Sequence, residues 1–172
     1  MKFIEFNMQD ETMMMALLPL YQTYEAEISE EELEDIFPAD EFDANYQHFK
    51  EYFEGKTTYI CVIDGEYKGF VTFHLDCEEV PGYVDGYKGW GHMSEIYVDK
   101  QLRRHGLGKV MVSKAEDELK KLEIKGIYLT DIVGNPLFWR SLDYIDTGLI
   151  EPNEGGRIYE KLIPFPKLPL PK

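Results

Sequence analysis

The chain lacks long apolar runs, and this absence excludes several classes of protein. Its longest uncharged stretch near the start, residues 12–24, contains Pro19 and is well short of the roughly 20 apolar residues that a membrane-spanning helix needs. The first residues also lack the basic segment followed by an apolar one that forms a secretory signal. We therefore expect a cytoplasmic protein with no membrane partner.

Cysteine is also scarce. Cys61 and Cys77 are the only two in 172 residues, and they lie 16 residues apart, without a metal-ligand spacing between them. Both lie in strand-like segments, where a reduced cysteine behaves as a small apolar residue. The sequence therefore predicts two reduced thiols in or near the core and no metal site.

Basic residues are outnumbered by acidic ones, 18 against 33, which gives a formal net charge of −15. Nucleic-acid binding requires a basic footprint, so we expect no nucleic-acid partner. The charge is uneven: residues 1–55 hold 15 acidic side chains and two lysines, whereas residues 100–125 hold eight basic and four acidic side chains. The acidic part is either a solvated face that aids solubility or a surface that attracts cations, and the basic part can attract an anion.

Hydrophobic periodicity indicates an α/β fold. Strands are predicted over residues 2–7, 57–63, 67–75, 91–98, 126–133, 145–150 and 157–163, and helices over 9–24, 40–53, 106–123 and from Asn135-Pro136 onward. Asp64-Gly65 predicts a tight hairpin, and we expect Pro19 to bend or break the first helix. Asn135 is the expected cap of the last helix.

These elements predict a mixed, mostly antiparallel sheet of about seven strands flanked by about four helices. The length and the 44% apolar content suit a single domain, which we place over residues 1–163. Residues 164–172 alternate proline with apolar residues and are expected to form an extended C-terminal tail. Such a tail could pack on a neighbouring subunit, which allows a homodimer.

An arginine- and glycine-rich turn within residues 94–108 is the most informative motif. It reads Arg103-Arg104-His105-Gly106-Leu107-Gly108, follows a short apolar strand and begins an amphipathic helix. Several backbone N–H groups have no partner at a helix N-terminus, and the peptide dipoles make that end partly positive. The turn is therefore a candidate site for a phosphate or pyrophosphate.

The turn and the order of elements over residues 57–163 resemble the GCN5-related N-acetyltransferase (GNAT) superfamily. Its signature is Arg or Gln, two residues, Gly, one residue, then Gly or Ala, which residues 103–108 match. The resemblance implies a GNAT-like fold and acetyl-CoA as co-substrate, with the pyrophosphate on the backbone of the turn and the pantetheine arm on the preceding strand. The implied cofactor-binding residues are Ile96, Tyr97, Val98, Arg103, Arg104, His105, Gly106, Leu107, Gly108, Lys109, Asn135 and Phe138.

A second match covers residues 135–144, in which Asn135 would contact the pantetheine amide. Trp139 stands where many members of the family carry a tyrosine that protonates the departing thiolate. An indole N–H donates a hydrogen bond but is not an acid near neutral pH. Tyr144 is therefore the candidate acid, and its alternative role is a packing residue.

Two carboxylates are candidates for the base that deprotonates the acceptor amine. Glu95 directly precedes Ile96, and many relatives place a glutamate on this strand; the alternative is an ordinary edge carboxylate. Asp131 occupies an apolar-type position of its strand, and a buried aspartate needs a partner. We rank Glu95 above Asp131.

The predicted function is an N-acetyltransferase in which a primary amine attacks acetyl-CoA directly in a ternary complex. The loop before the fourth strand, residues 77–90, carries carboxylates and aromatic rings that suit a small cationic or peptide amine, or that simply pack the loop. The alternative function is a non-catalytic acyl-CoA-binding or regulatory module. The sequence does not identify the acceptor, the acyl chain length or the oligomeric state.

Overall fold

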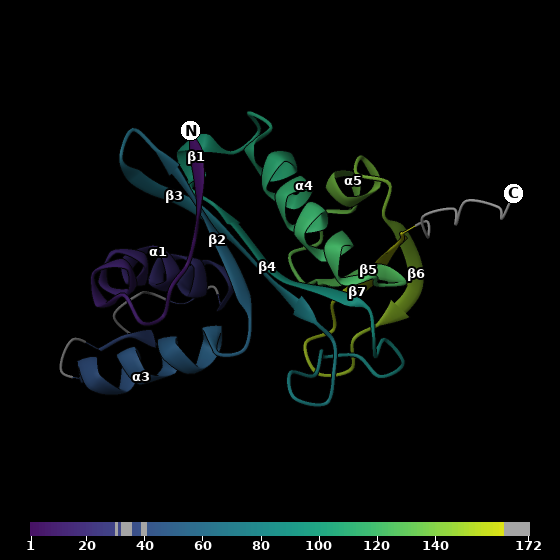
Figure 1. The fold of residues 1–172 in the computed structure, drawn as a ribbon, viewed down its shortest axis with the longest axis horizontal. Coiled ribbons are helices and arrows are strands. Elements are labelled where there is room, and N and C mark those ends of the chain that lie inside the picture. Colours follow the sequence, from purple (N-terminus) through teal and green to yellow (C-terminus); the bar gives the residue numbers. More distant parts are fainter. Residues whose placement is uncertain (30, 32–35, 39–40, 164–172) are drawn as a thin grey trace, which may run out of the picture. The chain divides into compact units, whose positions relative to one another are not determined.

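The structure is a computed structural model that describes residues 1–29, 31, 36–38 and 41–163 (Figure 1). The strands are β1 (Lys2–Glu5), β2 (Thr57–Ile63), β3 (Glu66–Leu75), β4 (Gly91–Val98), β5 (Gly126–Asp131), β6 (Ile145–Ile150) and β7 (Arg157–Leu162). The helices are α1 (Glu11–Ser29), α3 (Phe42–Phe53), α4 (Leu107–Leu119) and α5 (Pro136–Arg140), with short 3₁₀ helices η2 (Lys100–Leu102) and η3 (Lys120–Leu122). The predicted tail lies outside the described residues.

The described strands form one seven-stranded sheet in the order β1-β2-β3-β4-β5-β7-β6. Antiparallel pairs join β1 to β2, β5 to β7 and β6 to β7, whereas β4 and β5 run parallel through Gly91 with Ile127 and His92 with Tyr128. A parallel pair needs a long crossover connection, and α4 supplies it. The predicted mixed sheet with about four helices is confirmed.

The contacts divide the chain into two compact units. The first contains residues 1–72 and 95–113, and the second contains residues 73–94 and the chain from 114 onward. Each unit is therefore described by itself. The predicted single domain over residues 1–163 stays a prediction.

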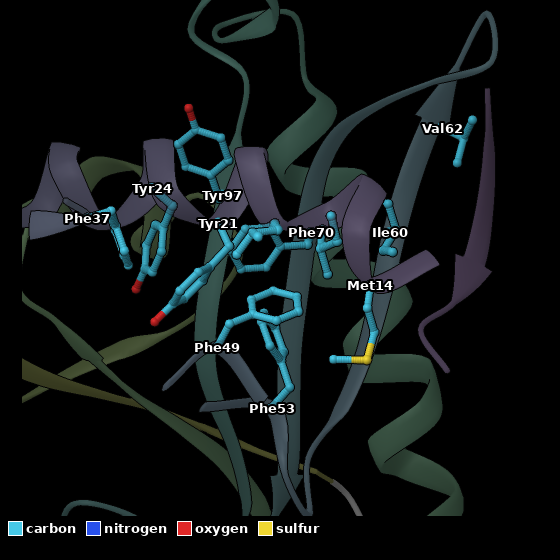
Figure 2. Packing of buried hydrophobic residues seen from close by; sticks show 12 residues of the cluster. Met14, Tyr21, Tyr24, Phe37, Phe49, Phe53, Ile60, Val62, Phe70 and Tyr97 are labelled. Atoms are coloured by element: carbon cyan, nitrogen blue, oxygen red, sulfur yellow. The ribbon is translucent and has the colours of Figure 1, made fainter. Parts of the chain in front are cut away.

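The core of the first unit is an aromatic cluster beneath α1 (Figure 2). Its buried members are Met14, Leu17, Leu18, Tyr21, Tyr24, Phe37, Phe49, Phe53, Ile60, Val62, Phe70 and Tyr97. The ring of Tyr21 meets Phe49 and Phe53 edge to face, with centroids 5.3 and 5.6 Å apart. Such edge-to-face pairs are the favoured aromatic arrangement, so the cluster fixes α1 and α3 against the strands.

Helix α1 begins directly after Asp10, whose carboxylate accepts the Met13 N–H at 3.1 Å. Of the two effects expected of Pro19, a bend or a break, the break does not occur, since α1 continues through Pro19 to Ser29. Proline removes one helical hydrogen bond. Leu17, Leu18 and Tyr21 on either side of it are nearly fully buried, and this packing holds the helix together across the gap.

Helix α3 carries a stripe of aromatic residues at helical spacing, and only part of this stripe is core. Phe49 and Phe53 are buried on α3, whereas Phe42 at its first turn remains 47% exposed. The stripe therefore packs through its C-terminal half.

The hairpin between β2 and β3 has the predicted turn. Asp64 and Gly65 have φ values of 51° and 87°, which are the left-handed conformations that a two-residue hairpin loop needs. Further along β3, a Cβ on Gly69 would lie 2.5 Å from the Tyr97 carbonyl oxygen and 3.2 Å from Met111 of α4. Because adjacent strand residues face opposite ways and Phe70 joins the aromatic cluster, α4 packs on the face opposite α1.

A buried ion pair and an aromatic stack organise the second unit. Lys161 of β7 donates to both carboxylate oxygens of the buried Glu116, at 2.9 and 3.0 Å, and to the Leu142 carbonyl oxygen at 2.9 Å. Elsewhere in the unit, the ring of Tyr87 stacks on that of Tyr128, with centroids 4.3 Å apart. Tyr87 belongs to the long loop before β4, so at least this part of the loop is a packing element.

None of the helices among the described residues combines the length and apolar character that crossing a membrane requires.

Candidate active site

The Arg-Gly turn, residues 99–108, joins β4 to α4 within the first unit. The Asp99 carboxylate accepts the Gln101 N–H at 2.9 Å, and the Asp99 carbonyl accepts the Leu102 N–H at 2.8 Å, which together form η2. Arg104 and Gly106 then adopt left-handed conformations, with φ values of 65° and 87°. These two residues turn the chain into the first turn of α4.

The backbone of this turn presents unused donors. Within the described part of the chain, no group accepts a hydrogen bond from the N–H groups of residues 104–108. A Cβ on Gly106 would meet nothing within 4 Å, so the space beside it is open. Unpaired N–H groups at the positive end of α4 form an arrangement that can bind a phosphate.

Arg103 has two partners within the first unit. Its Nη2 lies 2.6 Å from Glu27 Oε2 of α1, and its Nε donates to the Val98 carbonyl oxygen at 2.8 Å. Arg104 is exposed and forms no ion pair within the described residues. Of the two arginines, Arg104 is therefore the one with an uncommitted guanidinium.

Glu27 is the centre of this network. It also accepts a hydrogen bond from the Tyr97 hydroxyl at 2.8 Å, and Lys100 Nζ lies 3.5 Å from it. Partial burial opposes ionisation of Glu27, but hydrogen bonds from Arg103 and Tyr97 outweigh it and lower its pKa. Burial, followed by the hydrogen bond to the Glu27 carboxylate, raises the pKa of Tyr97 well above its usual range.

Glu95, the predicted base, is half-buried on β4 and accepts a hydrogen bond from the Tyr24 hydroxyl of α1. The Tyr52 hydroxyl of α3 lies 3.5 Å from that of Tyr24. Sequence reasoning missed Tyr24, Tyr52 and Glu27. The available signal was the three-residue spacing of Tyr24 and Glu27, which places them on one helix face.

The other predicted cofactor residues of the first unit fall into three groups by burial. Tyr97 and Leu107 are buried, so their side chains belong to the packing. Ile96, Val98 and Gly108 are half-buried, and His105 and Lys109 are exposed beside the turn.

Asp131, in the second unit, has the partner that a buried aspartate needs. Its carboxylate accepts the N–H groups of Gly134 at 3.0 Å and Asn135 at 2.7 Å. Asn135 is the N-cap residue of α5, as predicted, although its side chain makes no capping hydrogen bond to the helix. Asp131 instead shapes the loop that leads into α5 and leaves the exposed Asn135 side chain uncommitted to the helix.

Trp139 and Tyr144 are both packing residues in their surroundings. Their rings meet edge to face with centroids 5.6 Å apart, and Phe138 contacts Trp139 at 4.8 Å. Tyr144 is only 2% exposed, and burial together with the nearby Glu116 carboxylate raises its pKa well above its usual value. A phenol with a raised pKa is a weaker acid, so these surroundings favour the packing role for Tyr144.

Comparison with known proteins gives a family match for this chain. The model of the acetyltransferase (GNAT) family matches residues 21–137. No curated protein sequence matches the chain significantly.

Solved structures resemble the fold. An aminoglycoside 6'-N-acetyltransferase complexed with coenzyme A is 17% identical with a TM-score of 0.66, covering 96% of this chain and 99% of that one. The aminoglycoside 6'-N-acetyltransferase of Enterococcus faecium is 17% identical with a TM-score of 0.64 and the same coverage. The ribosomal-protein-alanine N-acetyltransferase of Brucella melitensis biovar Abortus 2308 is 18% identical with a TM-score of 0.51, covering 74% and 77%.

Proposed function

The chain belongs to the acetyltransferase (GNAT) family, and we propose that it transfers the acetyl group of acetyl-CoA to a primary amine. The family and fold class expected from the sequence are confirmed, and acetyl-CoA is the co-substrate. The amine acceptor, the mechanism and the individual site residues are proposals.

The observation that carries the proposal is the set of unused N–H donors at the start of α4. They suit the pyrophosphate of CoA, and the exposed Arg104 can add a charge-assisted contact to a phosphate. The backbone of residues 96–98 is proposed to bind the pantetheine arm. Contacts of Asn135 and Phe138 with the pantetheine arm are separate proposals.

Glu95 is the proposed general base. It takes a proton from the acceptor ammonium, directly or through a water molecule, so that the amine nitrogen has a lone pair. The nitrogen attacks the thioester carbonyl carbon, a C–N bond forms, and the C–S bond breaks as the tetrahedral intermediate collapses. The departing thiolate takes up a proton, and the products are the N-acetylated amine and free CoA.

The acceptor is proposed to be a small cationic amine or a peptide amine. The acidic character of residues 1–55 favours a cation, as do the carboxylates and exposed Tyr83 of the loop before β4. Two of the structural neighbours are named for their acceptors, an aminoglycoside and a ribosomal-protein alanine, which are one small molecule and one peptide amine.

A screen of amines tests the proposal. The purified chain is incubated with acetyl-CoA and a panel of aminoglycosides, polyamines and short peptides, and free thiol and acceptor mass are both recorded. We expect thiol release matched by acetylation of at least one amine. Tight CoA binding with no release from any amine would instead favour the non-catalytic module, and absence of CoA binding would overturn both functions.

A further inference from the structure

Helix α1 and strand β4 exchange tyrosine and glutamate side chains in two reciprocal pairs. Tyr24 of the helix donates to Glu95 of the strand, and Tyr97 of the strand donates to Glu27 of the helix. Tyr24 and Glu27 are three residues apart and share a helix face, while Glu95 and Tyr97 are two apart and share a strand face. The two elements are thus joined by a matched pair of polar contacts beside an apolar core.

The Tyr24 hydroxyl is held in place by its ring. Tyr24 is only 7% exposed, and its ring meets Phe70 and Tyr97 edge to face with centroids 5.4 and 5.8 Å apart (Figure 2). A ring packed on two sides leaves its hydroxyl little freedom. The position of the hydroxyl, and of the carboxylate that accepts from it, is therefore set by the core.

The second pair connects the same helix face to the Arg-Gly turn. Glu27 binds Arg103 of the Arg-Gly turn, and Arg103 also donates to the Val98 carbonyl oxygen. One face of α1 therefore contacts both the strand position of the proposed base and the turn proposed to bind pyrophosphate.

We propose that Tyr24 is a positioning residue for Glu95, and that α1, through Tyr24 and Glu27, aligns the base with the cofactor turn. This inference rests on the proposed function, in which Glu95 is the base. A hydroxyl that donates to a carboxylate stabilises its ionised form and fixes its orientation. Glu95 is then ionised and oriented before the acceptor binds.

The polar and charged groups around this carboxylate come from three elements. Tyr24 donates from α1, Tyr52 lies behind it on α3, and Tyr97 follows on β4 itself. The Glu27 carboxylate is balanced by Arg103, its ion-pair partner. Of these three tyrosines, Tyr24 is the one whose hydroxyl donates to Glu95.

The test is the Tyr24→Phe variant, which removes only the hydroxyl. We expect the pKa of the Glu95 carboxyl, followed by carbon NMR of the glutamate-labelled protein, to rise by about one unit. The acidic limb of kcat/KM should move to higher pH by the same amount, because Glu95 then takes up its proton earlier as the pH falls. The Kd for CoA should remain within about twofold.

Tyr59→Phe is the matched control. It also removes a hydroxyl that donates to a carboxylate, that of Glu5 at 3.3 Å between β2 and β1. This variant should leave both the Glu95 pKa and the acidic limb unchanged. If Tyr24→Phe fails to fold, 3-fluorotyrosine at position 24 keeps the ring and a more acidic hydroxyl, and it should lower the Glu95 pKa.

The two measurements separate the possible failures. An unchanged Glu95 pKa in Tyr24→Phe would overturn the positioning role whatever the activity. A raised pKa with an unmoved activity profile would remove Glu95 as the base, and the positioning role with it. A wild-type chain that acetylates no amine would refute the proposed function itself, while the pKa measurement would still show that the contact with Tyr24 exists.

Discussion

Glu27 and Arg103, which lie 76 residues apart in the sequence, form an ion pair with Nη2 2.6 Å from Oε2. The guanidinium also holds the Val98 carbonyl oxygen. Arg103, the first arginine of the signature, therefore has partners within the protein, whereas the adjacent Arg104 forms no ion pair within the described residues. This division of contacts between the two arginines predicts that their substitutions differ in their effects on CoA affinity and on stability.

Arg104→Gln should weaken CoA binding by about tenfold, since it removes a charge-assisted contact to a phosphate. Arg103→Gln should change CoA affinity less and lower Tm more, because it breaks the contact with Glu27. Calorimetric titration with CoA at low and high salt, together with thermal melts, distinguishes them. A larger loss of affinity in Arg103→Gln than in Arg104→Gln would contradict this division.

Stability should depend on Glu27 in a defined pH range. The folded chain holds the Glu27 pKa below its usual value of 4.5, so the ionised carboxylate stabilises the fold above that pH. The stabilisation is lost as the pH falls through the lowered pKa. Urea midpoints of wild type and Glu27→Gln should therefore differ by a constant amount above pH 4.5 and converge below it. A difference that does not vary with pH would show that the charge of Glu27 contributes nothing.

Gly82→Ala should destabilise the second unit by about 2 kcal/mol through overpacking. A Cβ there would lie 1.6 Å from the Tyr128 hydroxyl oxygen and 2.7 Å from Asp76 Oδ2, two buried groups that are hydrogen-bonded to each other. Adding Tyr128→Phe removes the nearest atom, so the double variant should lose less stability than the two single losses together. Strictly additive losses in urea unfolding would argue against the clash.

Lys161→Met should cost about 2 kcal/mol or more, because it removes the nearest ammonium partner of the buried Glu116 carboxylate and leaves the more distant Lys120 Nζ, 3.4 Å away. Replacing both residues with apolar ones, as Glu116→Leu with Lys161→Met, should restore part of the loss, since no buried charge then remains. Urea unfolding measures both. A double variant that is less stable than Lys161→Met would contradict the proposed cause.

Local patterns in the sequence predicted the parts of the fold that local rules decide. Asp64-Gly65 predicts the hairpin because two left-handed residues match the twist of the strands. The start of α1 after Asp10 follows from the need to cap helical N–H groups. The Arg-Gly turn was predictable for the same reason, since its glycines and the amphipathic helix are adjacent in the sequence.

Tertiary packing determines the features of the fold and the site that local patterns did not predict. The local rule for Pro19 predicted a bent or broken helix, but the buried residues around it keep α1 continuous. No local pattern around Arg103 predicts its partner Glu27. None around Glu95 predicts its partner Tyr24, which lies 71 residues away in the sequence. At α5 the expected residue, Asn135, occupies the N-cap position, but the loop before it is held by Asp131 from the preceding strand.

The most direct test of the central claim is to measure acetyl transfer and CoA binding side by side in wild type and Glu95→Gln. The acceptor is the best amine of the screen, followed by thiol release, and CoA affinity is measured by calorimetry on the same preparations. We predict that Glu95→Gln lowers kcat at least about 100-fold and leaves the Kd for CoA unchanged. Transfer by Glu95→Gln at the wild-type rate would contradict the account.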